Sequence, residues 1–333
     1  PKNRDSLFPS DQLAWEVTKE DFFNNLDIKW WNDFKIRASY GAGGNNRIGV
    51  DLWKTLYLGG SNYGYAVGEA VTPGFAPNAF ANPSIIWETT VSRNLGFDFS
   101  FFKNRLNATI DLYSNNTKDL LLSARVPSST GWDNRQENMG KTSNKGIEIQ
   151  LSGIAAESRN FSYNISANVA FNKNKIVSLG MDQFGRPFNS YPASSGGVNG
   201  EDFLVQVGGP LGQYFGYVSD GRYKLEDFDV TYHASTNSYT YKIKPGVPNA
   251  RAVALGGRDP QPGDMKLKKL SNTPGDDITA ADKTVLGNAF PAFAGGINQQ
   301  FRYKNFDLTV FMNFSVGNET YNANKTEFTG QYL

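Results

Sequence analysis

The sequence predicts an all-β protein built as an antiparallel transmembrane β-barrel. Two observations predict this fold: strands that alternate apolar and polar residues, and connections that alternate between short and long. The run FSYNISANVAFN from Phe161 shows the first pattern, with apolar residues at odd positions such as Ile165 and Val169 and polar ones at even positions such as Asn164 and Asn168. Strand side chains alternate between two faces. We expect the odd residues to face lipid and the even residues to line a lumen.

The clearest strand patterns and the connections between them follow one another in order along the chain. The predicted strands are residues 34–40, 87–101, 106–121, 146–153, 161–176, 296–303 and 306–316. Short connections fall at 103–105, 155–160 and 304–305, and long ones at 41–86, 122–145 and 177–293. Short periplasmic turns and long extracellular loops are typical of outer-membrane barrels. The last loop is too long to lack structure, so we expect small strands or ligand contacts within it.

Aromatic residues gather near the predicted strand ends, at Trp15, Phe22, Phe23, Trp30 and Trp31 and again at Phe99, Phe101 and Phe102. Barrels place such rings at the membrane interfaces. Aromatic residues in the core of a soluble β-sandwich would have the same composition, so the sandwich is the alternative fold.

Composition excludes several classes of function. Lys plus Arg number 33 and Asp plus Glu number 32, so the net charge of +1 gives no reason to expect nucleic-acid binding. The absence of Cys excludes disulfides, thiolate metal sites and a cysteine nucleophile. No apolar stretch reaches the ~20 residues of a membrane-spanning helix.

Catalytic residues are scarce. His233 is the single histidine, so a Ser-His-Asp triad or a multi-histidine metal site has little to build from. Adjacent carboxylates such as Glu201 with Asp202 are typical of solvated loops, although a carboxylate-only site in a barrel enzyme stays open as an alternative. We therefore expect no enzyme activity and no catalytic residues.

The long loops mix aromatic and polar residues, which suits an oligosaccharide, because sugar C–H faces stack on rings while hydroxyls bond to polar groups. A peptide, or loops that pack on each other, would suit the same mixture. The ligand-binding candidates are Trp53, Tyr57, Tyr63, Tyr65, Trp132, Tyr191 and Tyr214.

Several segments, in order along the chain, resemble the SusC/RagA family of TonB-dependent outer-membrane transporters. They include FKIRASYGAGGNN from Phe34, NPSIIWETTVSRNLGFDFSFFKNRLNATIDLYSNNTKDLLL from Asn82 and VPSSTGWDNRQENMGKTSNKGIEIQLSG from Val126. NVAFNKNKIVSLG from Asn168, GGPLGQYFGYVSDG from Gly208 and DITAADKTVLGNAFPAFAGGINQQFRYKNFDLTVFMNF from Asp277 continue the match.

The resemblance implies a portion of a barrel of about 22 strands. Residues 1–333 would form about eight of its strands, as part of a TonB-dependent receptor β-barrel domain without the plug domain and the final strands. It further implies an importer in the outer membrane of a Gram-negative, Bacteroidota-type bacterium. Its partners would be a SusD-like lipoprotein, the TonB complex through the N-terminal region, and the lipid bilayer, with no nucleic acid. The cargo would be an oligosaccharide. The alternatives are a peptide importer of the same family and a non-transporting, glycan-binding β-sandwich.

One stretch departs from the family pattern. LSNTPGDDITAADK lies where many members carry a calcium-loop-like D-x-N-x-D-G run, but Pro274 and Gly275 interrupt the spacing. Calcium needs six to eight oxygens. We expect an ordinary acidic loop without a cofactor; the calcium alternative would use Asn272, Asp276, Asp277 and Asp282.

Overall fold

The computed structural model describes residues 6–45, 49, 51–194, 200–322 and 324. The chain divides into two compact units. Unit 1 comprises residues 1–190, 206–211 and 290–318, and unit 2 comprises residues 191–205, 212–289 and 319–333.

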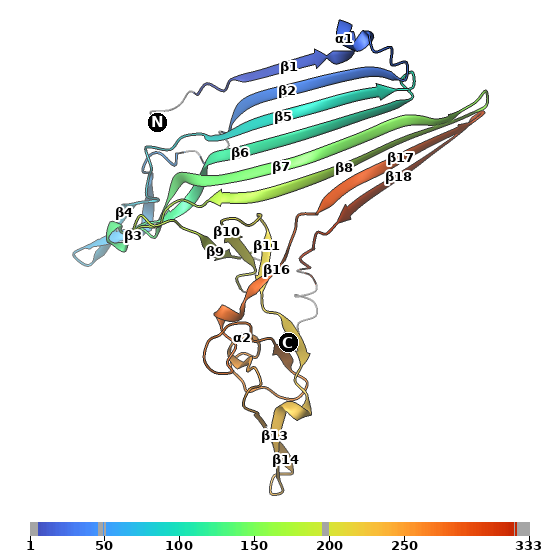
Figure 1. Ribbon diagram of the computed structural model, residues 1–333. Helices are drawn as coiled ribbons and strands as arrows, with labels where there is room; N and C mark the ends of the chain where they lie inside the picture. Colours follow the sequence, from blue (N-terminus) through green and yellow to red (C-terminus); the bar gives the residue numbers. More distant parts are fainter. Residues whose placement is uncertain (1–5, 46–48, 50, 195–199, 323, 325–333) are drawn as a thin grey trace. The chain divides into compact units, whose positions relative to one another are not determined.

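Unit 1 is dominated by a single sheet, in which eight strands of the described residues lie side by side (Figure 1). Every neighbouring pair is antiparallel. In sheet order the strands are β1 (Ser10–Glu16), β2 (Trp31–Asn45), β5 (Glu88–Phe101), β6 (Leu106–Arg125), β7 (Asn134–Glu157), β8 (Phe161–Ser178), β17 (Phe293–Tyr303) and β18 (Phe306–Val316).

The register gives this sheet one apolar and one polar face. Residues opposite each other in neighbouring strands share a face. One cross-strand row contains Ile36, Phe97, Ile110, Ile149 and Val169. The adjacent row, on the other face, contains Lys35, Asp98, Thr109, Gln150 and Asn168. The two faces predicted for the run from Phe161 therefore extend across the neighbouring strands.

The turns at one end are short, as predicted: β5 and β6 are joined by residues 102–105, β7 and β8 by 158–160, and β17 and β18 by 304–305. In the first of these turns, Phe102, Lys103 and Asn104 adopt positive φ values of 57°, 59° and 65°. The Ser100 hydroxyl donates to Asn104 Oδ1 at 2.7 Å, and the backbone N–H of Lys103 donates to Asn32 Oδ1 at 2.5 Å. Side-chain hydrogen bonds thus hold a left-handed backbone that residues other than Gly seldom adopt.

Aromatic rings cluster at this turn end of β2 and β5. Phe34 stacks on Phe99 at 4.9 Å between ring centroids, and Trp30 stacks on Phe101 at 5.8 Å. Trp31 contacts Phe23 edge-on at 5.2 Å. Phe23 belongs to α1 (Asp21–Asn24), which follows η1 (Val17–Lys19) after β1. The clustering predicted from the sequence is present.

One strand was not predicted, and one predicted boundary is wrong. β1 was not among the predicted strands, and all seven of its residues pair with β2. The expected loop at 122–145 is largely strand, because β6 continues to Arg125 and β7 begins at Asn134. Only residues 126–133 connect the two strands, and η2 (Ser128–Thr130) lies among them. Register shifts around Leu120 break the alternation there, which explains why the sequence pattern hid the pairing.

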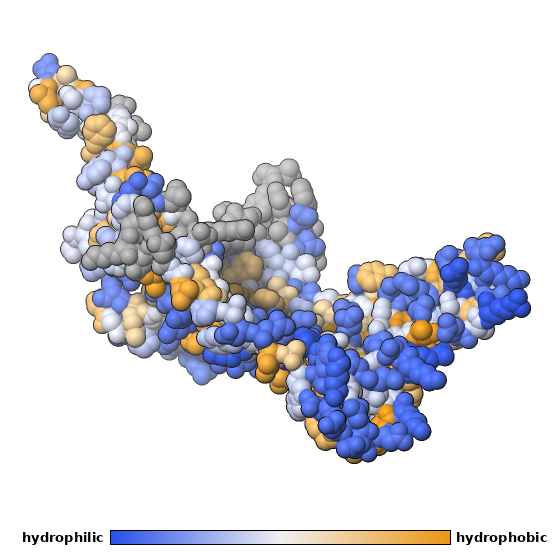
Figure 2. Space-filling view, turned by 90° about the horizontal axis from the view of Figure 1, so that it is seen from above, coloured by the Kyte–Doolittle hydropathy of each residue, from blue (hydrophilic) through white to orange (hydrophobic). Residues whose placement is uncertain are grey.

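The connection from β2 to β5 carries a hairpin of β3 (Tyr57–Val67) and β4 (Ala70–Pro77). The hairpin forms the arm at the left of Figure 2, where hydrophobic and weakly polar residues prevail over charged ones. Large side chains such as Tyr65, Val71 and Phe75 are exposed on it.

β8 and β17 are neighbours in the sheet although residues 179–292 separate them in the chain. Their pairing starts at Ala170, so the later part of β8 has no β17 partner. The segment 206–211 returns to this edge. The backbone N–H of Ile176 donates to Gly209 O at 2.8 Å, and the backbone N–H of Gly208 donates to Ile176 O at 2.8 Å. Asn174 Oδ1 also accepts a bond from the backbone N–H of Leu211 at 2.9 Å.

Unit 2 contains the small strands expected in the last long loop. One sheet has the order β16 (Thr284–Asn288), β11 (Gln213–Gly216), β10 (Phe203–Gln206), β9 (Ser190–Ala193). Two-stranded pairs are formed by β12 (Ser219–Arg222) with β15 (Met265–Leu267) and by β13 (Phe228–His233) with β14 (Ser238–Ile243). The helical turns are η3 (Leu225–Asp227), α2 (Arg251–Ala254) and η4 (Ala280–Asp282).

Unit 2 has a small core of its own. Ala250, Leu267 and Ile278 are buried together, and Tyr217 and Val253 pack against them. The hydroxyl of buried Tyr223 donates to Pro248 O at 2.6 Å and accepts from the backbone N–H of Ala250 at 3.0 Å. Among the described residues, no helix has the length and apolar character needed to cross a membrane.

Candidate functional site

Three segments of unit 1 meet at the loop end of β6 and β7 and form a pocket. They come from the start of the β2–β5 connection, from its end after β4, and from the β6–β7 connection with the start of β7. The pocket has a volume of about 330 Å³. Its lining residues are Asp51, Leu52, Lys54, Leu56, Asn78, Ala79, Phe80, Ala81, Trp132, Asn134, Arg135 and Gln136.

Asn82 joins the three segments. Its side chain is buried, with 9% of the residue exposed, and its Nδ2 donates to Gln136 O at 2.8 Å. Its backbone N–H donates to Leu52 O at 2.9 Å, and its Oδ1 accepts from the backbone N–H of Ser84 at 3.0 Å. One asparagine thus links residues far apart in the sequence, and its buried polar atoms all have partners.

Asn138 makes a second link between segments, close in sequence to the pocket residues of β7. Its Oδ1 accepts from the backbone N–H of Ile86 at 2.9 Å, and its Nδ2 donates to Ile86 O at 2.9 Å. The same Nδ2 donates to Asp119 O at 2.7 Å, at the irregular part of β6. The Asn138 side chain thus supplies hydrogen bonds where the pairing of β6 with β7 is irregular. It also links the first part of β7 to Ile86, which precedes β5.

The pocket combines aromatic surface with charges of both signs. The Arg135 guanidinium lies over the Phe80 ring, 5.1 Å from its centroid, and pairs with Glu137. The Lys54 ammonium pairs with Asp51 at 2.8 Å. Paired charges leave little net field, so the pocket suits a neutral ligand with an apolar face and many hydroxyl or amide groups.

Of the predicted loop aromatics, the structure brings only Trp132 into this pocket. Trp53 lies in the same connection, but its ring is outside the lining and has the Lys54 ammonium 5.6 Å from its centroid. Tyr57, Tyr63 and Tyr65 are exposed on β3. These four residues and Trp132 were predicted from the composition of the loops, which does not indicate that Tyr57, Tyr63 and Tyr65 lie on the hairpin.

The other two predicted residues belong to unit 2. Tyr191 lies on β9 and is partly buried. Tyr214 packs against Phe203 at 5.5 Å and Tyr321 at 5.9 Å between ring centroids. Its hydroxyl donates to Glu319 O at 3.1 Å and accepts from the backbone N–H of Tyr321 at 3.2 Å. These contacts give Tyr214 a structural role within unit 2.

Sequence reasoning missed Asn82, Asn138, Lys54 and Arg135 as site residues. The Asn-Pro pair at residues 82 and 83 is a turn signal and could have indicated a fixed bend. No local pattern relates residues 51–56 to residues 132–136, because the contact between them depends on the tertiary fold.

A charged network lies on the polar face of the sheet. Arg37 on β2 donates to Asp98 through Nε at 2.7 Å and Nη2 at 3.1 Å, and its Nη2 lies 3.2 Å from Asp111 Oδ1. Asn94 Nδ2 donates to Asp111 at 3.1 Å, and the Thr109 hydroxyl donates to Asp98 at 3.1 Å. The network connects charged and polar side chains across three strands on the polar face of the sheet.

The four calcium candidates do not converge. Asp276 Oδ2 accepts from the backbone N–H of Gly246 at 2.8 Å, and Asp277 Oδ1 accepts from Asn249 Nδ2 at 2.9 Å. Asp282 accepts hydrogen bonds from backbone N–H groups of its own loop. Within the described part of the chain, no group of three or more His, Cys, Asp or Glu side chains is arranged to hold a metal.

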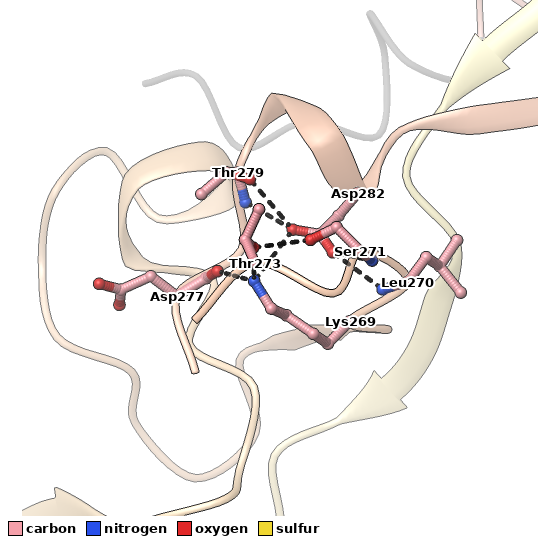
Figure 3. A network of polar contacts seen from close by, with 7 residues as sticks. All are labelled: Lys269, Leu270, Ser271, Thr273, Asp277, Thr279 and Asp282. Carbon is pink, nitrogen blue, oxygen red and sulfur yellow. Dashed lines mark hydrogen bonds and ion pairs between the residues drawn. The ribbon is translucent and has the colours of Figure 1, made fainter. Parts of the chain in front are cut away.

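Asp282 instead accepts bonds from its own loop (Figure 3). The backbone N–H groups of Leu270 and Ser271 donate to Oδ1 at 2.8 and 2.7 Å, and that of Thr279 donates to Oδ2 at 2.8 Å. Burial by itself raises the pKa of Asp282, but the N–H donors, led by Ser271 and Thr279, outweigh it and hold the pKa well below the ordinary aspartate value.

His233, the single histidine, lies exposed at the end of β13, where Nε2 is 2.8 Å from the Thr240 hydroxyl. It is the last residue of β13 in the β13–β14 hairpin. No carboxylate contacts it among the bonds described for this hairpin, and the position gives no catalytic arrangement.

The antiparallel sheet, with an apolar face, a polar face, short turns at one end and long connections at the other, defines this chain as part of a transmembrane β-barrel. Residues 3–255 match the family model described as TonB dependent receptor-like, beta-barrel. The chain belongs to this family, whose members are outer-membrane receptors and transporters and not a family of enzymes.

The curated relatives include TonB-dependent receptors P39 and P3 of Formosa agariphila. P39 is 29% identical over 335 residues, covering 94% of this chain and 29% of that protein. P3 is 32% identical over 323 residues, covering 96% and 29%. The TonB-dependent receptor SusC of Bacteroides thetaiotaomicron is 26% identical over 322 residues, covering 96% and 28%. This chain therefore spans less than a third of the length of these relatives.

Solved structures show the same fold. The RagAB peptide transporter matches with a TM-score of 0.67 at 21% identity, covering 95% of this chain and 30% of that chain. The RagAB peptide importer in its open-open state matches with a TM-score of 0.70 at 20% identity, covering 95% and 29%. Together with SusC, these matches confirm the resemblance to the SusC/RagA family that the sequence motifs predicted.

Proposed function

We propose that the whole protein imports oligosaccharides across the outer membrane of a Gram-negative, Bacteroidota-type bacterium, as a TonB-dependent transporter with a SusD-like lipoprotein partner. The three-segment pocket at the loop end of the barrel wall carries the choice of substrate. It offers the rings of Trp132 and Phe80 beside the polar side chains of Asn78, Asn134 and Gln136. A sugar ring presents an apolar C–H face and a rim of hydroxyls, which this combination complements.

In this proposal, each part of the protein has its own role in import. The sheet supplies the wall, with the Arg37 network on the face that we assign to the lumen. The loops supply contacts to the cargo, and the lipoprotein closes over it. Movement of the plug, driven by the TonB complex, would then open the route. The plug and the TonB-contacting region are features that the family resemblance assigns to the whole protein.

A second candidate cargo is a peptide, because the chain is similar in fold to the RagAB peptide transporter and the RagAB peptide importer. A peptide would use its backbone amides where a sugar uses hydroxyls, so the same pocket residues would serve. The two cargoes are distinguished by binding of the whole transporter and its lipoprotein to panels of glycans and peptides. Binding of peptides without any glycan would overturn the oligosaccharide proposal.

The pocket is tested by Trp132→Ala in the full-length transporter, with Trp53→Ala as the matched control. Both substitutions remove an indole from the loops, but only Trp132 lines the pocket. Loss of a buried aromatic contact costs about 1–2 kcal/mol, so Trp132→Ala should weaken oligosaccharide binding about tenfold. Trp53→Ala should leave it near wild type. Equal affinities for the two variants would remove the pocket from the proposal.

Transport is tested separately from binding. Cells that carry the full-length transporter should take up the bound oligosaccharide and should lose uptake, but not surface binding, when TonB is absent. Binding without any TonB-dependent uptake would favour the alternative of a glycan-binding surface protein.

A further inference from the structure

The Lys269 side chain of unit 2 ends in a cage of three oxygen atoms (Figure 3). Its Nζ donates to the Thr273 hydroxyl at 2.6 Å and to the backbone carbonyl of Asp277 at 2.6 Å, and it lies 3.5 Å from Asp282 Oδ2. The three oxygens come from a hydroxyl, a main-chain carbonyl and a carboxylate. Hard cations such as calcium bind to oxygen ligands of these kinds.

The cage is held by the chain around it. The Thr273 hydroxyl is 2.8 Å from that of Ser271, and the Asp277 carboxylate, which points away from Lys269, is bound by Asn249. Asp282 is fixed by the N–H groups of Leu270, Ser271 and Thr279. Each oxygen of the cage is therefore positioned by contacts other than the one to Lys269.

The cage brings together two groups of opposite charge. The Asp282 side chain is fully buried at 0% exposure, and that of Lys269 is 17% exposed. A buried carboxylate without a counter-charge is strongly destabilising, and the N–H donors around it are neutral. The Lys269 ammonium is the charged group that contacts Asp282 among the ion pairs of the described residues.

We propose that this cage is a cation site that the chain fills with its own Lys269 ammonium group. The loop from Lys269 to Asp282 then keeps its structure without any dissolved cation. In this acidic loop, the Lys269 ammonium supplies the positive charge that a bound metal ion would otherwise supply to Asp282. Removal of the ammonium should leave a cage that accepts a small external cation able to donate hydrogen bonds.

The test uses the full-length transporter, with hydrogen exchange at the backbone amides of Leu270, Ser271 and Thr279 as the readout. Lys269→Ala should speed exchange at these amides about tenfold, equivalent to about 1.4 kcal/mol. Ethylammonium should restore slow exchange in this variant. Tetramethylammonium carries the same charge without an N–H donor and should not restore it. The wild-type loop should exchange at the same rate with and without EDTA.

Two further variants separate the ammonium from its packing. Lys269→Met keeps most of the side-chain volume but lacks the charge, so it should speed exchange as Lys269→Ala does and resist rescue, because the cage stays filled. Lys268→Met changes the adjacent exposed lysine and should behave as wild type. If Lys269→Ala speeds exchange throughout unit 2, including the β13–β14 hairpin, the variant has unfolded the unit. The proposal is then judged from exchange in Lys269→Met alone.

Three results would overturn the proposal. These are faster exchange of the wild-type loop in EDTA, wild-type exchange in Lys269→Met, and failure of ethylammonium to slow exchange in an otherwise folded Lys269→Ala variant. Oligosaccharide binding does not enter the readout, so the outcome is independent of the cargo.

Discussion

The assignment of the apolar face of the sheet to lipid makes a quantitative prediction at Leu151. This residue lies on the apolar face of β7, opposite Ala108 of β6 and Ala167 of β8, neither of which offers a polar partner. It precedes Ser158, the first residue of the following turn, by seven positions. At a rise of about 3.4 Å per residue and a tilt of about 45°, that separation is about 17 Å along the membrane normal. The apolar band of a barrel is about 25 Å tall, so Leu151 lies inside it, within about 5 Å of its middle.

A lysine near the middle of the lipid face of a barrel costs about 2–4 kcal/mol, whereas a lysine in the lumen costs little. We therefore expect Leu151→Lys to lower the free energy of unfolding by about 2–4 kcal/mol relative to Leu151→Ala. The adjacent Ser152→Lys places the same charge on the opposite face, next to Asn107 and Ser166, and should change it by less than about 1 kcal/mol.

The assay is guanidinium unfolding of the full-length transporter in phospholipid vesicles, followed by tryptophan fluorescence and by heat-modifiable gel mobility. The Leu151→Ala variant accounts for the loss of the leucine itself. A Ser152→Lys variant as unstable as Leu151→Lys, or a Leu151→Lys variant as stable as Leu151→Ala, would refute the assignment of the faces.

Three other predictions follow from contacts described above. Asn82→Ala leaves Gln136 O and the Ser84 N–H without their side-chain partner, so exchange in residues 132–136 should quicken about tenfold. Asn78→Ala, which keeps the backbone bond to Leu56, is its control. Tyr223→Phe removes the hydroxyl between Pro248 and Ala250 and should destabilise unit 2 by about 1–3 kcal/mol in thermal unfolding, with the barrel unaffected. The depressed pKa of Asp282 means that its stabilising effect is complete above the unfolded value of about 3.9 and is lost as pH falls toward the folded value. Protection of the Ser271 amide, corrected for intrinsic exchange, should thus be constant from about pH 7 to 4.5 and decline only below about pH 4.

The sequence predicted the membrane-spanning strands well, because a period of two reports directly which residues share a face. It failed where that signal was absent. β1 is short and has only Leu13 and Trp15 as large apolar residues, so its sequence shows too little alternation to predict its pairing with β2. The start of β7, with the polar run NRQEN, is held by backbone pairing and by Asn138, neither of which requires alternation.

The site was harder to predict than the fold, for a physical reason. Aromatic composition selected both Trp132 and Tyr214, but Trp132 lines the pocket and Tyr214 packs against Phe203 within unit 2. Whether a ring lines a pocket depends on which distant segment lies against it. Here that is decided by the three hydrogen bonds of Asn82.

The long insertion between β8 and β17 has a consequence for how the sequence and length of this protein can change in evolution. About 110 residues separate β8 from β17 in the chain. The two strands nevertheless pair in the sheet without a register shift. The entropy of closing a loop grows only with the logarithm of its length, so doubling this insertion would cost only about 0.6 kcal/mol. Segment 206–211 already covers the β8 edge that the late start of β17 leaves open. Evolution could therefore lengthen, shorten or exchange the insertion while the paired strands of the sheet stay constant.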